Sequence, residues 1–322
     1  MSRYGMTIPL DGVPLGEQRD WIRELADLGY TDLWSAEAGA SDGFTPLVLA
    51  SQWAPEARLG CAIFPAYTRG PALFAMSVAA LCQAAPGRFV VGVGSSSNVI
   101  VESWNGIPFV KPYPRVRDTV RFLRRALTGE KVSEEYETFA VKGFRLGLKV
   151  DPQPKILIAA LRQGMLRLAG READGAIINW LSADDVETVA PIVRDAAPDG
   201  QDTEIVARIF VCPTPDADAA RGLGRLAVNA YLNVPVYAAF HEWLGRQGEL
   251  GAMWEKWKAG DRKGAAAAIP DRVVDELIVH GPPEKCREHI QRYVENGVDT
   301  PAIALLPFGG DPRQASRDLA PR

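Results

Sequence analysis

Residues 89–98 read Phe89-Val90-Val91-Gly92-Val93-Gly94-Ser95-Ser96-Ser97-Asn98. The first half is almost wholly apolar, as in a strand that is buried on both faces of a parallel sheet. Small hydroxyl residues follow at once, and their backbone N–H groups could hold a phosphate or a ring. The segment is not a dinucleotide fingerprint, because Ser97 stands where that motif needs its third glycine. A tight turn would also explain it.

Similar apolar, β-branched segments recur along the chain at residues 4–8, 32–35, 58–64, 156–160, 175–179, 204–212 and 302–306. Segments with helical spacing lie between them, at residues 15–28, 71–84, 114–128, 184–196 and 283–296. Eight strand–helix units without a flexible linker predict a (β/α)8 TIM barrel. A doubly wound sheet usually opens with a glycine-rich turn after its first strand, whereas residues 9–12 read Pro9-Leu10-Asp11-Gly12.

We expect one barrel domain over residues 1–322, with two insertion-bearing segments. Residues 129–153 include an alternating stretch, 139–146, that is typical of a small hairpin. Residues 213–300 hold extra helices and an aromatic-rich piece at 231–257. Insertions at the carboxyl ends of barrel strands would build the mouth of a substrate site.

The composition excludes several classes of protein. The chain has 322 residues, 47% of them hydrophobic, and a net charge of −4. A disordered chain would be less apolar, and a nucleic-acid-binding protein would usually be basic. A transmembrane helix is not expected, since no apolar run reaches about 18 residues. The N-terminus lacks the apolar core of a secretion signal, and the four cysteines are scattered, so the cytoplasm is the expected location.

The sequence lacks the residues that several other common catalytic mechanisms need. The three histidines show no HxH or HExxH spacing and the cysteines form no CxxC pair, so no metal site is predicted. The strand ends carry no lysine for a Schiff base, and a GxSxG elbow is absent.

Two further strand ends carry candidate site residues. Glu37 follows the second strand, where carboxylates of a barrel often lie in the active site, although a solvated loop acid is an equal alternative. Residues 161–165, Leu-Arg-Gln-Gly-Met, start a helix directly after the fifth strand. A helix N-terminus offers unpaired N–H groups to an anion, and Gly164 allows close approach, but a plain turn would read the same way.

The chain resembles the bacterial luciferase-like family, and within it the branch that uses coenzyme F420, an 8-hydroxy-5-deazaflavin. The matching stretches follow one another in the same order as in the family. The resemblance covers nearly the whole chain. It is carried by residues 28–37, 58–63, 86–97, 102–106, 112–118, 169–175 and 279–284.

The resemblance implies a ring bound at the carboxyl ends of the barrel strands. It implies a cis peptide bond between Ala62 and Ile63 in the third strand, which backs and bends the central ring. It also implies two phosphate anchors, one in the serine loop and one at the helix start near Gly164. The cofactor-binding set is then Ala62, Ile63, Gly94, Ser95, Ser96, Ser97, Asn98, Ala160, Gly164 and Met165.

The implied activity is hydride transfer between C5 of the deazaflavin and a small organic substrate, without oxygen insertion. The acidic tail of F420 would need basic residues at the rim, for which Arg69, Lys111, Arg115 and Arg162 are candidates. An FMN-dependent monooxygenase is the first alternative. A barrel that binds flavin or deazaflavin without turnover is the second. Family habit suggests a homodimer.

The chain departs from relatives that oxidise glucose 6-phosphate. Those enzymes have a histidine after the acidic residue of the second strand end and a glutamate in the glycine-rich loop. Ala38 and Asn98 stand at these positions, so sugar-phosphate oxidation is disfavoured. The catalytic proton carrier stays open between Glu37, Tyr67, Asn98 and water.

Overall fold

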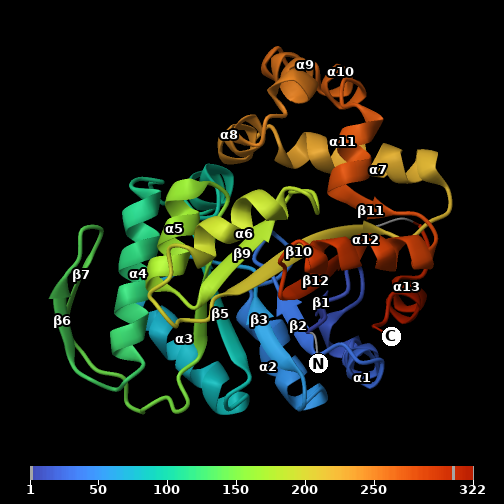
Figure 1. The fold of residues 1–322 in the computed structure, drawn as a ribbon. Helices are drawn as coiled ribbons and strands as arrows, with labels where there is room; N and C mark the ends of the chain where they lie inside the picture. Colours follow the sequence, from blue (N-terminus) through green and yellow to red (C-terminus); the bar gives the residue numbers. More distant parts are fainter. Residues whose placement is uncertain (1–2, 307–308, 322) are drawn as a thin grey trace.

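The barrel is described by a computed structural model over residues 3–306 and 309–321. Eight parallel strands surround its axis (Figure 1). They are β1 (Gly5–Thr7), β2 (Asp32–Ser35), β3 (Arg58–Cys61), β5 (Phe89–Gly94), β8 (Lys155–Ala159), β9 (Gly175–Asn179), β10 (Glu204–Cys212) and β12 (Thr300–Leu305). β10 pairs with both β9 and β12, and β12 pairs with β1, so the sheet closes. The predicted (β/α)8 barrel is confirmed.

Helices follow the strands around the outside of the barrel. They are α1 (Arg19–Asp27), α2 (Phe44–Trp53), α3 (Pro71–Ala84), α4 (Pro112–Ala126), α5 (Gln163–Glu172), α6 (Val186–Arg194), α12 (Pro283–Glu295) and α13 (Pro312–Asp318). A one-turn 3-10 helix, Leu15–Glu17, precedes α1. α3 has its predicted bounds because Pro71 fits the first helical turn. Before α6, Ser182 and Asp185 bond reciprocally, each side-chain oxygen accepting the other's backbone N–H.

The third strand is shorter than predicted. β3 ends at Cys61, and the chain resumes pairing with β5 as β4 (Phe64–Pro65). The intervening residues bulge out of the ladder, which local hydrophobicity does not reveal. A short strand that was not predicted, β11 (Ile278–His280), extends the sheet beside the end of β10.

The first insertion forms a hairpin of β6 (Val132–Glu135) and β7 (Ala140–Phe144). The alternating stretch therefore supplies only its second strand. The second insertion contains α7 (Ala217–Tyr231), α8 (Pro235–Trp243), α9 (Gln247–Lys258), α10 (Arg262–Ala267) and α11 (Asp271–Leu277). These helices stand over one end of the barrel (Figure 1). Together with the carboxyl ends of β10 and β12 they form a second apolar cluster, to which Trp254 and Trp257 contribute.

Alternate residues of β10 point into the barrel and form its layers. Glu204 lies at the amino end, Val206 belongs to the central apolar cluster, and Arg208 and Phe210 follow toward the carboxyl end. Trp34 fills the same central layer. A Cβ atom added to Gly60 would lie 2.3 Å from the Trp34 ring, so glycine is required there. The barrel centre is thus packed rather than open.

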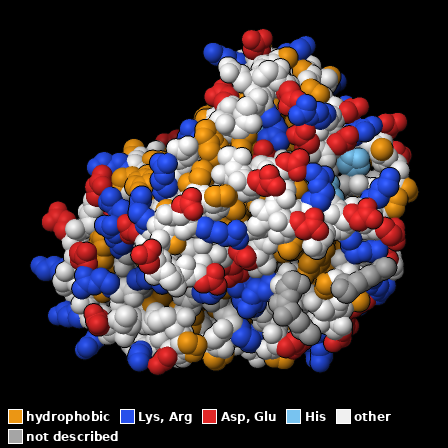
Figure 2. All heavy atoms as spheres, viewed as in Figure 1, with side chains coloured by type: hydrophobic (Ala, Val, Ile, Leu, Met, Phe, Trp, Pro, Cys, Tyr) orange, Lys and Arg blue, Asp and Glu red, His pale blue; other side chains and the backbone are white. Residues whose placement is uncertain are grey.

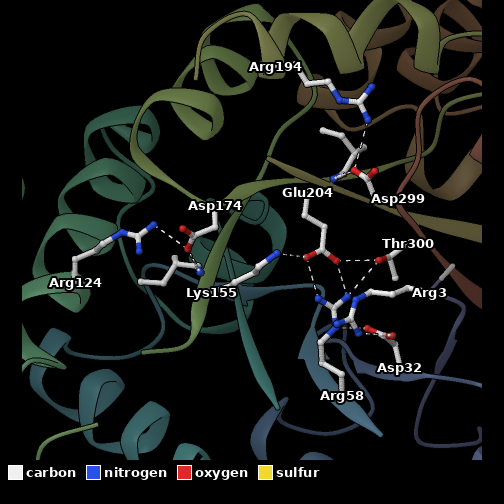
Figure 3. A network of polar contacts seen from close by, with 12 residues as sticks. Arg3, Asp32, Arg58, Arg124, Lys155, Asp174, Arg194, Glu204, Asp299 and Thr300 are labelled. Carbon is white, nitrogen blue, oxygen red and sulfur yellow. Dashed lines mark hydrogen bonds and ion pairs between the residues drawn. The ribbon is translucent and has the colours of Figure 1, made fainter. Parts of the chain in front are cut away.

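A buried ionic network closes the amino end of the barrel (Figure 3). Arg58 donates to Asp32 and to both carboxylate oxygens of Glu204. Glu204 also accepts a hydrogen bond from the Thr300 hydroxyl at 2.9 Å and another from the Lys155 ammonium group at 3.1 Å. The Arg58 and Glu204 side chains are only 9% and 6% exposed. Such charges are tolerated in the interior only because each has its partners.

This network predicts a specific loss of stability in acid. Burial alone would raise the pKa of Glu204, but hydrogen bonds and charge from Arg58, with help from Lys155 and Thr300, lower it from 4.5 to about 2. The folded-state pKa lies below the unfolded one, so this stabilisation is present above pH 4.5 and is lost as the pH falls toward 2. We expect about 3 kcal/mol to disappear over this window, at about 1.4 kcal/mol per pKa unit.

Urea unfolding between pH 6 and pH 2 would measure this loss, with Glu204→Gln as the control. That variant should be less stable at pH 6 but should lose less stability on acidification. Parallel pH profiles for the two proteins would contradict the assignment.

No helix within the described residues is both long and apolar enough to cross a membrane. On the face drawn in Figure 2, basic and acidic side chains are interspersed rather than separated by sign.

Candidate functional site

A cavity of about 800 Å³ opens at the carboxyl ends of the barrel strands. The ends of β2, β3, β5 and β8 form one side of it, and residues of α7 and α8 cover the other. Its size is that of a cofactor or ligand site. Most of the predicted site residues border it, namely Glu37, Ala62, Ile63, Ser95, Ser96, Ser97, Ala160, Gly164 and Met165.

The bulge after β3 forms part of the cavity wall. The Ala62–Ile63 peptide bond is cis, as the resemblance implied. Glycines on β5 make room for this bend, because a Cβ atom on Gly92 would lie 2.0 Å from the Cys61 carbonyl oxygen. One on Gly94 would lie 3.0 Å from the Ile63 side chain. Gly94 therefore supports the wall from behind rather than lining it.

The serine loop follows β5 at the same edge. Ser96 has a positive φ of 61°, and Ser97 accepts a hydrogen bond from the Ile100 N–H at 3.4 Å. A single π-helical turn, Val99–Trp104, comes next. Asn98 is exposed just before this turn and does not border the cavity.

The N-terminus of α5 also borders the cavity. Arg162 precedes the helix in an extended conformation and provides no side-chain cap. The first N–H groups of the helix, at Gln163, Gly164 and Met165, have no intrahelical acceptor. An atom added at the Cβ position of Gly164 would meet nothing within 4 Å. β5 and β8 are adjacent strands, so the serine loop and this helix start lie at neighbouring positions of the barrel rim.

Glu37 is held by Arg69. The Arg69 guanidinium donates to both Glu37 carboxylate oxygens, and the Gly43 N–H donates to one of them at 2.8 Å. The Glu37 and Arg69 side chains are 12% and 17% exposed, and the guanidinium carbon lies 5.1 Å from the Phe44 ring centre. Glu37 thus borders the cavity as a paired carboxylate that fixes the loop after β2.

Tyr67 lies away from the cavity lining. Its hydroxyl donates to the Val110 carbonyl at 2.6 Å, and burial raises the pKa of this phenol to about 12. Neither feature favours it as a proton carrier.

The predicted basic rim is largely engaged within the protein. Arg69 pairs with Glu37, and Lys111 with Glu137 at 3.3 Å. Arg115 donates to the Ala66 carbonyl at 3.0 Å. Arg162, which is exposed, differs from these three because it borders the cavity and forms no ion pair with any residue that the structure describes.

The cavity also contains residues that sequence reasoning missed. Arg208 faces it from β10, Asn179 from the end of β9, and Tyr231, Tyr237 and Trp243 from the helical insertion. A signal for Arg208 was present, since it is a charged residue at an inward position of an otherwise apolar strand. The tyrosines lie in the insertion that was expected to build the mouth, but which of its residues line the cavity depends on how the insertion folds back. Within residues 3–306 and 309–321, no cluster of three acidic, histidine or cysteine side chains could hold a metal ion.

The protein therefore belongs to the class of (β/α)8 barrels that carry a ligand-sized cavity at the carboxyl ends of their strands. Within that class, residues 3–300 match the family model described as luciferase-like monooxygenase, and the chain belongs to this family. The 5,10-methylenetetrahydromethanopterin reductase of Archaeoglobus fulgidus is 30% identical over 270 residues, which are 80% of this chain and 79% of that protein.

Solved structures agree on the fold. The coenzyme F420-dependent tetrahydromethanopterin reductase of Methanopyrus kandleri has a TM-score of 0.82 at 19% identity, covering 99% of this chain and 97% of that one. The oxygenating constituent of 3,6-diketocamphane monooxygenase from Pseudomonas putida, solved with FMN, has a TM-score of 0.67 at 16% identity, covering 99% and 97%. The same fold is thus found in one protein named for coenzyme F420 and in one solved with FMN.

Proposed function

We propose that the protein is a coenzyme F420-dependent oxidoreductase that transfers a hydride between C5 of the deazaflavin and a small organic substrate. The observation that carries the proposal is the convergence of three features on one cavity. These are the Ala62–Ile63 bulge, the serine loop after β5 and the uncapped start of α5. A relative from Mycobacterium tuberculosis that is 25% identical and named a putative coenzyme F420-dependent oxidoreductase supports F420 over FMN.

The residues present fit the coenzyme. Ala62 and Ile63 would back a planar ring, and the serine hydroxyls with the α5 amides would hold a phosphodiester. Open space at Gly164 leaves room for the phosphate oxygens. Arg162 is the rim cation that could meet the acidic tail, since the other three candidates are engaged.

When bound, F420 would supply a carbon-centred hydride donor or acceptor. The protein's part would be to orient the two reactants and exclude water, with reacting atoms about 3–3.5 Å apart. Arg69 occupies both oxygens of Glu37, Tyr67 lies outside the cavity lining and Asn98 is exposed. Water in the cavity is therefore our proposed proton carrier.

Side-by-side titration with F420 and FMN tests the cofactor. We expect F420 to bind with a micromolar or lower Kd, followed by deazaflavin fluorescence, and FMN to bind at least tenfold more weakly. FMN lacks the oligoglutamate tail that Arg162 would contact, so Arg162→Met should reduce the difference between the affinities for F420 and FMN.

Absence of F420 binding would remove the proposal. Preferential FMN binding with flavin-stimulated oxygen uptake would establish the monooxygenase alternative. Tight F420 binding without any substrate-dependent change of its redox state would leave a non-catalytic binding protein. We also propose a homodimer, to be measured by light scattering coupled to size-exclusion chromatography.

A further inference from the structure

Arg208 stands between two cavities at the barrel mouth. It borders both the 800 Å³ cavity and a second one of about 440 Å³ that lies toward β1 and β12. Its neighbours in register are Asn179 on β9 and Ala302 on β12. The guanidinium is therefore placed where a ligand in either cavity would meet it.

Arg208 has no counterion within the part of the chain that the structure describes. Its Nε is buried and lacks a hydrogen-bond partner. Its guanidinium carbon lies 5.2 Å from the Phe210 ring centre, so a cation–π contact is the interaction that the charge makes there. The five residues outside the described ranges carry no acidic side chain. By contrast, the buried or half-buried Arg58, Arg69 and Arg246 each pair with a carboxylate.

The surroundings disfavour an unpaired charge. Desolvation lowers the pKa of Arg208, and interactions with Tyr231, Tyr237 and the exposed Asp11 only partly offset this. An arginine nevertheless stays protonated in a protein. A partly desolvated cation without a partner is costly, and an anion that binds to it recovers that cost. The planar fork of a guanidinium matches the two oxygens of a carboxylate.

The lining around Arg208 indicates the rest of such a ligand. Asn179 donates to the Tyr237 hydroxyl at 3.4 Å, so polar groups stand beside the guanidinium. Tyr231, Val234 and Trp243 add aromatic and aliphatic surface nearby in the lining. The site thus combines one charged group with an apolar wall.

We propose that Arg208 binds the carboxylate of the substrate, so that the protein acts on a small organic acid with an apolar or aromatic body. This inference rests on the proposed oxidoreductase function, because only that function makes the bound acid a substrate. The proposed coenzyme anchors follow β3, β5 and β8, whereas Arg208 lies on β10, which β9 separates from β8. A carboxylate on Arg208 would therefore occupy a different part of the mouth.

Calorimetric titration of the cofactor-free and F420-saturated protein with benzoate, and with neutral benzamide of the same shape, tests the inference. We expect wild type to prefer benzoate at least tenfold. Arg208→Met should abolish the preference while leaving the affinity for F420 within about threefold. Arg208→Lys keeps the charge without the fork and should retain a weakened preference. Arg121→Met, at an exposed arginine outside the lining of both cavities, is the matched control and should behave as wild type.

Thermal unfolding supplies the folding control. Arg208→Met should unfold at the wild-type temperature or higher, since it removes a half-buried unpaired charge, and benzoate should stabilise wild type but not this variant. Equal binding of benzoate and benzamide, unchanged benzoate binding by Arg208→Met, or no benzoate binding at millimolar concentration would overturn the proposal. So would a large loss of F420 affinity in Arg208→Met. Absence of F420 binding with an intact benzoate preference would instead refute the coenzyme while leaving an Arg208 anion site.

Discussion

Replacing Arg58 with methionine should lower the free energy of unfolding by about 3–5 kcal/mol at pH 7, the range found when one partner of a buried ion pair is removed. Arg58 lies between Asp32 and Glu204 at the closed end of the barrel. Without it, two buried carboxylates lose their main hydrogen-bond donor and repel each other. Lys155, which is 49% exposed, remains beside Glu204 but cannot reach both acids in the same way. Urea unfolding followed by circular dichroism measures the change.

Arg121→Met is the matched control for this prediction. Arg121 also forms a two-pronged pair, with Glu172, but its side chain is 51% exposed. Exposed pairs contribute between 0 and about 1 kcal/mol, so this variant should stay close to wild type. If Arg58→Met and Arg121→Met were equally mild, the network would have no special part in stability.

Replacing Gly164 with aspartate should weaken F420 binding by well over tenfold, which corresponds to about 1.4 kcal/mol for each factor of ten. The new carboxylate would lie in the first turn of α5, in the space where we place a phosphate. Two like charges would then compete for the same N–H groups. Fluorescence titration of the purified variant measures the effect.

The steric and the electrostatic effects of a substitution at Gly164 can be measured separately. A side chain at Gly164 meets no neighbour, so the aspartate variant should fold with wild-type stability. Gly164→Asn has nearly the same shape without the charge, and we expect it to lose much less affinity. Equal losses for Asp and Asn would point to steric exclusion, and retained affinity in Gly164→Asp would show that the anchor lies elsewhere.

The fold was predictable because a closed parallel barrel buries every strand on both faces. The resulting apolar runs, such as Phe89–Gly94, stand out from helices with one apolar stripe. The break in the third strand was not visible in this pattern. It depends on the contact between Cys61 and Gly92, which are far apart in the sequence. The glycines of β5 carried that information, but as isolated residues they suggested a loop motif.

The site was predictable where it depends on strand ends, since a barrel brings all of them to one rim. Ser95–Ser97 and Gly164 therefore meet at one cavity although their signals were individually weak. Tyr67 and Asn98 follow strand ends as well, but their side chains are committed to a backbone carbonyl or to solvent. Arg208 was missed because a sequence shows a charge in a strand and not whether that charge has a partner.

Within the residues that the structure describes, the ionic network and Trp34 close the amino end and the centre of the barrel, so both reactants must enter from the carboxyl end. Because both reactants enter from the same end, the one that binds deeper in the cavity must bind first and dissociate last. We expect steady-state kinetics to show ordered addition of the two reactants and inhibition by an excess of the second one.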